Sequence, residues 1–335
     1  MNKTRCIIPA RIDVAKHYFM TGGHYAKKEY LDTMASRILI FQSFLHQRKN
    51  EIVLPEIKKL FENKIYKSNA LKICEGRPIL DPIQVSFLLN IPGQEVAMHK
   101  DVPWFFGMDR FNLPSWLLIV MEQSGLYEKD RIPQIQGVSY LHDWKDYEEA
   151  KGGFYFYPNG PAGKKVTVSA KANQALILDG SKVPHATETF RPNKKIQTKL
   201  DKNEQYLLKH QDNSWNMYLK KNLTKIANYP NEDIRISFVW RQRCFRDEEE
   251  KETYHKKVNA TLLDPKIIID NLIQNLLSLG KIKQMPESEI DTIITLLKYY
   301  VEYPYPDSIF PYNYCVAAEK FLPSYIKSLS DVFCS

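Results

Sequence analysis

The chain has 335 residues, 44% of them hydrophobic, and a formal net charge of +8. A chain of this length and apolar content can bury a sizeable core in one large domain or two smaller ones. Its longest strongly apolar run, residues 116–121, is too short to cross a bilayer, and the N-terminal residues lack the apolar region of a signal peptide. We therefore expect a cytoplasmic protein without a membrane partner.

The distribution of charge and the spacing of the cysteines narrow the class of protein further. Lysine and arginine are spread along the chain, with no basic block interleaved with regularly spaced aromatic residues, so we expect no nucleic-acid partner. The positive charge is compatible with an anionic small-molecule ligand and equally with solubility alone. The five cysteines lack zinc-binding or disulfide-framework spacing, so we expect reduced thiols. They are Cys6, Cys74, Cys244, Cys315 and Cys334.

Residues 1–82 are predicted to form helices that support the core and carry no recognisable catalytic or binding motif. In residues 28–47, apolar side chains recur every three to four positions, which is typical of a helix with one packing face. A second helix is expected over residues 54–66, with Pro55 in its first turn.

The middle of the chain consists of short β-type runs separated by turn residues. We expect eight strands, at Ile83–Leu89, Glu95–Lys100, Ile135–Leu141, Gly153–Tyr157, Lys165–Ser169, Ala175–Leu178, Val183–Thr189 and Ile234–Arg241. Eight antiparallel strands in two facing sheets form a jelly roll, or double-stranded β-helix, in which a metal ion can lie between the sheets. Residues 113–125 are predicted to form a helix, from Pro114 to Gly125, that packs in the core.

These patterns predict an α+β protein with a mainly β core. Residues 83–245 would be the double-stranded β-helix, with an insertion at 191–231 that is either a lid or a mobile segment and is expected to be helical around residues 204–223. After residue 246, helical periodicity returns, with helices expected near 267–277, 290–300 and 315–329. We expect the three parts to form one compact domain.

The candidate site is a histidine and an aspartate two residues apart on a predicted strand. Residues i and i+2 of a strand point to the same face, so His99 and Asp101 can bind one metal ion together. A third ligand, for which His185 is the candidate, would complete the two-histidine, one-carboxylate triad that binds iron(II) and leaves positions open for substrate and O₂. The sequence therefore predicts an iron centre at His99, Asp101 and His185.

Five segments, in the same order as in the family, resemble one group of enzymes. The runs Tyr140-Leu141-His142-Asp143-Trp144 and Gly152-Gly153-Phe154-Tyr155-Phe156-Tyr157-Pro158 look like the YLN-x-W and GG…P run of prolyl-hydroxylase-type members of the Fe(II)/2-oxoglutarate dioxygenase superfamily. Pro92-Gly93 and the His-x-Asp pair lie upstream of these runs. Val183-Pro184-His185 lies downstream, followed by Arg235-Ile236-Ser237, which is similar to the family's Arg-x-Ser. The long gap between His185 and Arg235 departs from the family pattern.

The resemblance implies that the cofactors are Fe(II), 2-oxoglutarate as co-substrate, and O₂. Arg235 and Ser237 would bind the far carboxylate of 2-oxoglutarate, and Tyr140 would donate its hydroxyl to the same group. A planar guanidinium suits this role because it forms bidentate hydrogen bonds with a carboxylate.

The sequence constrains the substrate less than the cofactors, because proteins with one fold catalyse many different reactions. The chain is similar to algal kainoid synthases, which oxidatively cyclise N-prenylated glutamate-type precursors, and this resemblance implies an anionic amino-acid-derived small-molecule substrate. Asp101 argues against a halogenase, in which a small residue replaces the carboxylate ligand. The residues expected at the substrate are Arg110, Lys182, Arg191, Arg241 and Trp104.

Two alternatives to cyclisation remain open. A prolyl or other amino-acid or peptidyl hydroxylase is supported by the segments at 140–144 and 152–158. A cupin-like binding protein without turnover is the non-enzyme alternative, although such a protein would usually have lost a metal ligand, and all three are present here. The sequence leaves the oligomeric state open.

Overall fold

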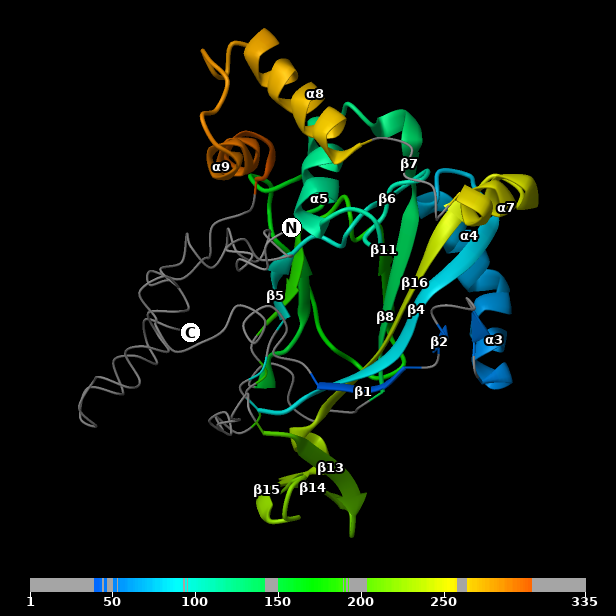
Figure 1. The fold of residues 1–335 in the computed structure, drawn as a ribbon. Helices are drawn as coiled ribbons and strands as arrows, with labels where there is room; N and C mark the ends of the chain where they lie inside the picture. Colours follow the sequence, from blue (N-terminus) through cyan, green and yellow to red (C-terminus); the bar gives the residue numbers. More distant parts are fainter. Residues whose placement is uncertain are drawn as a thin grey trace, which may run out of the picture.

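Two antiparallel sheets lie at the centre of the computed structural model (Figure 1). The structure describes residues 39–43, 45–46, 51–52, 54–92, 94, 96–141, 150–188, 190, 192, 204–257 and 264–302. The five-stranded sheet has the order β1 (Leu39–Ser43), β4 (Ile79–Asn90), β16 (Arg235–Phe245), β8 (Gln134–Tyr140), β11 (Ala175–Leu178). The four-stranded sheet has the order β10 (Val166–Val168), β9 (Phe154–Phe156), β12 (His185–Thr187), β5 (Val96–His99). Each of the eight predicted strands overlaps one of these.

The two sheets pack against each other through a shared apolar cluster. Leu88, Val138 and Val239 from the larger sheet contact the same cluster as Phe154 from the smaller one. This mixed α/β arrangement with a sheet-rich core places the inner faces of β5, β12 and β16 toward one another, where the candidate site lies.

Helices cover the outer faces of both sheets. α3 (Pro55–Glu62) and α4 (Lys64–Ile73) lie on the larger sheet, where Phe61 packs in one apolar cluster with Phe238 and Trp240 of β16. The prediction had one helix here, but Asn63 ends α3 and caps α4 by accepting hydrogen bonds from the backbone N–H groups of Ile65 and Tyr66.

α5 (Ser115–Ser124) covers the smaller sheet together with α8 (Pro265–Ser278) and α9 (Glu289–Tyr300) (Figure 1). Residues 116–121 of α5 are all buried, as predicted, and Gly125 ends the helix in the left-handed region, with φ of 71°. The helices predicted near 267–277 and 290–300 correspond to α8 and α9.

The predicted helix over residues 28–47 is wrong where the structure describes it. Residues 39–43 form β1, which pairs with the edge of β4, and β2 (Leu45–His46) pairs with β3 (Glu51–Ile52). A short apolar run fits a helical or an extended period, and here the open edge of β4 provides a partner that favours the strand. Residues 28–38 of this prediction lie outside the described part of the chain.

The helix predicted around residues 204–223 is also wrong. This part of the insertion is an antiparallel sheet of β13 (Tyr206–Gln211), β14 (Ser214–Leu219) and β15 (Lys225–Pro230) (Figure 1). Asp212 and Asn213 join β13 to β14 with φ of 50° and 58°, the conformation of a two-residue hairpin turn. The Asp-Asn pair is a turn signal that the helix prediction did not use.

The prediction of reduced thiols is wrong for one pair, because Cys74 and Cys244 form a disulfide. Both are fully buried, Cys74 at the end of α4 and Cys244 on β16. Their 170-residue separation hides the pairing from any analysis of local spacing. The packing of α4 on the larger sheet brings the two residues together, and disulfides of this kind are typical of oxidising compartments.

The remaining elements are short or peripheral. They are β6 (Trp104–Phe105), η1 (Glu128–Asp130), β7 (Arg131–Ile132), η3 (Asn231–Asp233) and α7 (Glu248–Lys257). The helix expected near 315–329, the residue Arg191 and the segment 142–149 lie outside the described residues. In the described part of the chain, no helix has the length and apolar content needed to span a membrane.

Candidate metal centre

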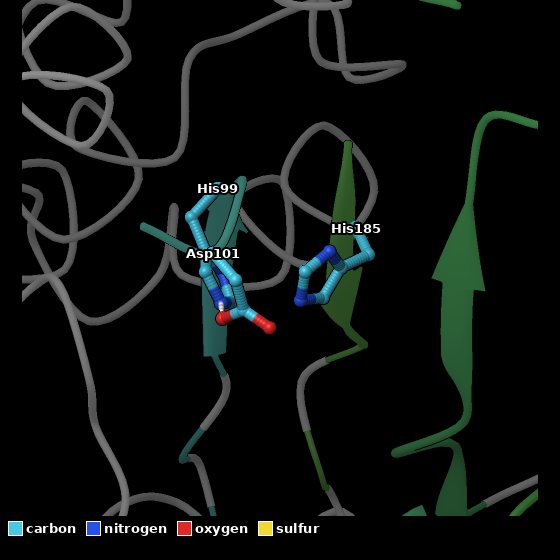
Figure 2. A group of neighbouring side chains, drawn as sticks. All are labelled: His99, Asp101 and His185. Atoms are coloured by element: carbon cyan, nitrogen blue, oxygen red, sulfur yellow. Dashed lines mark ion pairs between the residues drawn. The ribbon is translucent and has the colours of Figure 1, made fainter. Parts of the chain in front are cut away.

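His99, Asp101 and His185 converge between neighbouring strands (Figure 2). One ligand atom from each residue lies within 4.8 Å of the others. His99 ends β5 and is paired in register with His185, the first residue of β12, so the antiparallel ladder sets the two imidazoles side by side with ring centroids 4.3 Å apart. Asp101 follows two residues after His99, and its carboxylate points to the same place.

All three side chains are buried, at 8%, 0% and 1% exposure for His99, Asp101 and His185. Nδ1 of His185 lies 2.8 Å from the carbonyl oxygen of Val183. With its proton on Nδ1, donated to that carbonyl, His185 presents the lone pair of Nε2, which is the form that binds a metal. Phe154 stacks on the same ring at a centroid distance of 5.4 Å and fixes its plane.

Two contacts hold Asp101. Its backbone N–H donates to the carbonyl oxygen of Gly180 over 2.8 Å. Nη1 of Arg241, on the inner face of β16, lies 2.9 Å from its Oδ1. A buried carboxylate flanked by two imidazoles and oriented by a guanidinium is thereby fixed before any ion binds.

Gly180 is a site residue that the sequence analysis missed. A Cβ at this position would lie 2.2 Å from Oδ2 of Asp101 and 3.1 Å from Cε1 of His185. Only glycine therefore leaves room for the two ligands to approach each other here. The Asp179-Gly180-Ser181 turn shortly before His185 was the available signal.

The loop that carries Gly180 is braced by a buried arginine. Arg131 pairs with the carboxylate of Asp179 and donates to Oγ of Ser181 over 3.0 Å. The backbone N–H of Ser181 donates to Oδ1 of Asp179 over 2.9 Å. Local sequence does not reveal the role of Arg131, because its partners lie far along the chain.

Lys100 lies between the two ligands in sequence, just after β5 ends, and its side chain contacts α5. Its ammonium lies 3.9 Å from Oε2 of Glu122 on α5, and burial lowers its pKa while Glu122 raises it. This contact ties the ligand-bearing segment to α5.

Arg235 is buried on the facing sheet, at 2% exposure. Its Nε donates to the carbonyl oxygen of Gly152 over 2.9 Å, and its Nη1 donates to Oδ1 of Asn90 over 2.9 Å and to Oγ of Ser237 over 3.3 Å. The ring of Tyr140 lies 5.2 Å from its guanidinium carbon. Burial lowers the pKa of Arg235 and raises the pKa of Tyr140. Arg235, Ser237 and Tyr140 are thus together, and Asn90 is a neighbour that the sequence analysis missed.

The guanidinium of Arg235 is incompletely satisfied. Among the described residues, its Nη2 has no hydrogen-bond partner and no carboxylate pairs with it. A buried cation with an unused donor is costly unless an anionic acceptor binds it. The carboxylate of 2-oxoglutarate is an acceptor of this kind, so the residues present fit that group.

Of the five residues expected at the substrate, Arg241 pairs with Asp101. Arg110 and Trp104 contact each other, with the guanidinium carbon 5.5 Å from the ring centroid. Lys182 is turned away, because its ammonium pairs with Glu75 over 2.7 Å at the surface. Arg191 lies outside the described residues.

Comparisons with known proteins give structural matches only. No protein-family model matches the chain, and no curated protein matches its sequence. A prolyl-4-hydroxylase from Pseudomonas putida matches with a TM-score of 0.28 and 12% identity, over 57% of this chain and 63% of that protein. A Trichoplax adhaerens prolyl hydroxylase, in complex with a hypoxia-inducible-factor peptide, matches with a TM-score of 0.35 and 11% identity, over 72% and 80%.

HygX from Streptomyces hygroscopicus, bound to nickel, 2-oxoglutarate and hygromycin B, matches with a TM-score of 0.28 and 8% identity, over 65% of this chain and 87% of that protein. The match to the Pseudomonas putida enzyme covers 63% of that protein, so the chain spans less than two thirds of its length. At these TM-scores, the similarities do not decide the reaction of this chain. The residues of the site carry that argument, and a set of two imidazoles and one carboxylate is compatible with iron.

Proposed function

We propose that this chain is an Fe(II)/2-oxoglutarate-dependent dioxygenase, an oxidoreductase. The observation that carries the proposal is the convergence of His99, Asp101 and His185 from neighbouring strands. Three such ligands hold iron(II) on one side and leave its other positions open. The incompletely satisfied Arg235 on the facing sheet supports the proposal independently.

In this proposal, His99, Asp101 and His185 are the metal ligands. Iron(II), together with 2-oxoglutarate and O₂, supplies the oxidant that removes hydrogen from a substrate carbon. Arg235 binds the far carboxylate of 2-oxoglutarate, with Ser237 and Tyr140 as further donors. Asn90 and Gly152 orient the guanidinium of Arg235, and Phe154 shields His185 from water. The two sheets are then the halves of a double-stranded β-helix.

The substrate that we propose is an anionic amino-acid-derived small molecule, oxidised by C–C cyclisation of an N-prenylated glutamate-type precursor as in kainoid synthases. Support comes from the cationic residues near Asp101 and from the sequence resemblance. The outcome depends on positioning, because a substrate radical either gains a hydroxyl group or closes a ring onto a double bond held nearby.

The alternative is a prolyl or other peptidyl hydroxylase. Gly152, the first residue of the Gly-Gly pair that favours this alternative, accepts a hydrogen bond from Arg235. A cupin-like binding protein without turnover is disfavoured, because the structure brings all three ligand residues together.

One experiment separates these functions. The protein is incubated with iron(II), 2-oxoglutarate and O₂ and either N-prenylated glutamates or proline-containing peptides, and succinate and product masses are measured. We expect succinate with the acids and a product that has lost two hydrogen atoms. A product that gains one oxygen atom indicates hydroxylation. Succinate with the peptides alone would replace the cyclisation proposal by the alternative, and no succinate with any substrate would contradict the proposed enzyme class.

Arg235→Ala is expected to weaken 2-oxoglutarate binding by about 30-fold or more, because a buried charge-assisted contact is lost from one side. Binding is measured by titration of the Mn(II)-loaded protein, so the readout does not depend on turnover. The exposed Arg246 supplies the matched control, and Arg246→Ala should leave the affinity unchanged. Equal affinity in Arg235→Ala and the wild type would remove Arg235 from this role.

A further inference from the structure

The turn between β14 and β15 carries a tripeptide that matches the acceptor pattern for N-linked glycosylation. Asn222-Leu223-Thr224 has the form Asn-x-Thr, in which x is not proline. The same pattern occurs at Asn2 and Asn259, which lie outside the described residues. Such tripeptides also occur by chance, so the pattern acquires meaning only from the accessibility of the asparagine and from the compartment in which the chain folds.

The β14–β15 turn is accessible. Residues 220–225 are all exposed, and the small sheet that carries them lies at the end of the molecule opposite α8 (Figure 1). The turn is closed by the backbone, because the N–H of Leu219 donates to the carbonyl oxygen of Thr224 over 2.9 Å. A bulky polar group on Asn222 would therefore extend into solvent and displace no core residue.

The side chain of Asn222 leaves the reactive atom available. Its Oδ1 accepts a hydrogen bond from the backbone N–H of Thr224 over 3.1 Å. Within the described residues this is the only hydrogen bond of the side chain, so Nδ2, the atom that would carry a glycan, is not engaged. The asparagine is thus exposed, held in a defined turn and free to react at its amide nitrogen.

The disulfide between Cys74 and Cys244 gives independent evidence on the compartment. Disulfides form and persist in oxidising compartments, such as those of the secretory route, and are rare where thiols are kept reduced. Both cysteines are fully buried, which is typical of a structural disulfide rather than an exposed regulatory one. N-linked glycans are attached along the same route, so the disulfide and the acceptor tripeptide point to one environment.

We propose that the chain folds in an oxidising secretory compartment and carries an N-linked glycan on Asn222. Nδ2 of Asn222 forms a bond to the anomeric carbon of a lipid-linked oligosaccharyl diphosphate, supplied with its transferase by the cell. The bond from that carbon to the diphosphate oxygen breaks, and the amide loses one proton as the lipid diphosphate leaves. A thiol-disulfide exchange catalyst of the compartment accepts the two electrons and two protons that Cys74 and Cys244 lose.

This inference is independent of the proposed enzyme function, because neither the disulfide nor the acceptor tripeptide belongs to the candidate metal centre. It departs from the expectation of a cytoplasmic protein. That expectation rested on sequence patterns alone, whereas the disulfide joins residues that only the fold brings together.

The first test uses the full-length protein isolated from its natural source. It is treated with a peptide N-glycosidase in heavy-oxygen water and analysed by peptide mass spectrometry. We expect Asn222 to be converted to heavy-oxygen-labelled aspartate, which separates it from the tripeptides at Asn2 and Asn259. A digest without reductant should contain the peptides of Cys74 and Cys244 as one linked pair.

The second test directs the full chain into the secretory pathway of eukaryotic cells and compares variants by electrophoretic mobility. Asn222→Gln and Thr224→Ala should each lose one glycan, whereas Thr224→Ser should keep it, because the hydroxyl group remains. Asn159→Gln is the matched control, since Asn159 is also exposed in a turn but is followed by Gly160 and Pro161. It should keep the glycan.

Three results would each overturn the inference. The first is an unmodified Asn222 in the natural protein, even if the disulfide is present. The second is free thiols at Cys74 and Cys244 in that protein, because they remove the evidence for the compartment. The third is equal mobility of Asn222→Gln and the wild type in the secreting cells, because it would show that the turn is not an acceptor.

Discussion

His185→Ala is expected to lower the affinity for a divalent metal by more than about 100-fold, beyond the 10- to 100-fold typical of losing a partner that only orients a ligand. Turnover should disappear with it. His185 supplies one of three ligand atoms, and the remaining pair, His99 and Asp101, comes from a single short segment. Two ligands cannot define the one-sided geometry that the proposed reaction needs.

Metal affinity is measured with Co(II) by absorption, and retention of the fold by circular dichroism. His210→Ala is the matched control, because His210 is exposed on β13 and its ring contacts Asn231 rather than the candidate centre. Wild-type Co(II) affinity in His185→Ala would show that His185 is not a ligand.

Gly180→Ala is expected to weaken metal binding by about 10- to 100-fold while the protein stays folded. The added methyl group would lie 2.2 Å from Oδ2 of Asp101, so the carboxylate must rotate away. His185 offers little room on the other side, since its Cε1 would be 3.1 Å from the same methyl group. One substitution thereby displaces a ligand without removing any ligand atom.

The control for Gly180→Ala is Gly280→Ala, after α8. Gly280 has a positive φ, of 64°, which Gly180 does not have, so alanine strains the backbone there, but no atom lies within 4 Å of an added Cβ. It reports the cost of losing a glycine without crowding the site. Equal Co(II) affinity in Gly180→Ala and Gly280→Ala would contradict the steric argument. An affinity lowered in both would indicate a general loss of stability.

The strands could be predicted because their sequences are short β-type runs separated by turn residues. The pairing of His99 with Asp101 could be predicted because residues two apart in an extended segment point to the same face, although Asp101 lies just beyond the end of β5. The hairpin turn at Asp212 and Asn213 was missed because the insertion was interpreted from its polar composition and length, without the turn preference of the Asp-Asn pair. Residues 39–43 were missed because only the edge of β4 decides their conformation.

Features that depend on distant packing could not be predicted. Cys74 meets Cys244 only once α4 lies on the larger sheet. Gly180 matters because of side chains on two other segments, which no local pattern reveals. Lys182 and Arg241 looked equivalent in sequence, but Lys182 pairs with Glu75 whereas Arg241 faces Asp101. The roles assigned to these residues in binding stay predictions.

β16 has two different faces, and this limits how the protein can evolve. Arg235 and Arg241 point inward, whereas Phe238 and Trp240 pack against α3 and α4. Because side chains alternate along a strand, inserting one residue between Ser237 and Arg241 would turn Arg241 toward the helices and bury its charge in their apolar contact. Inserting two would keep the face and move Arg241 by roughly 7 Å. The number of residues between Arg235 and Arg241 can therefore change in evolution only by an even number if both arginines are to stay on the inner face.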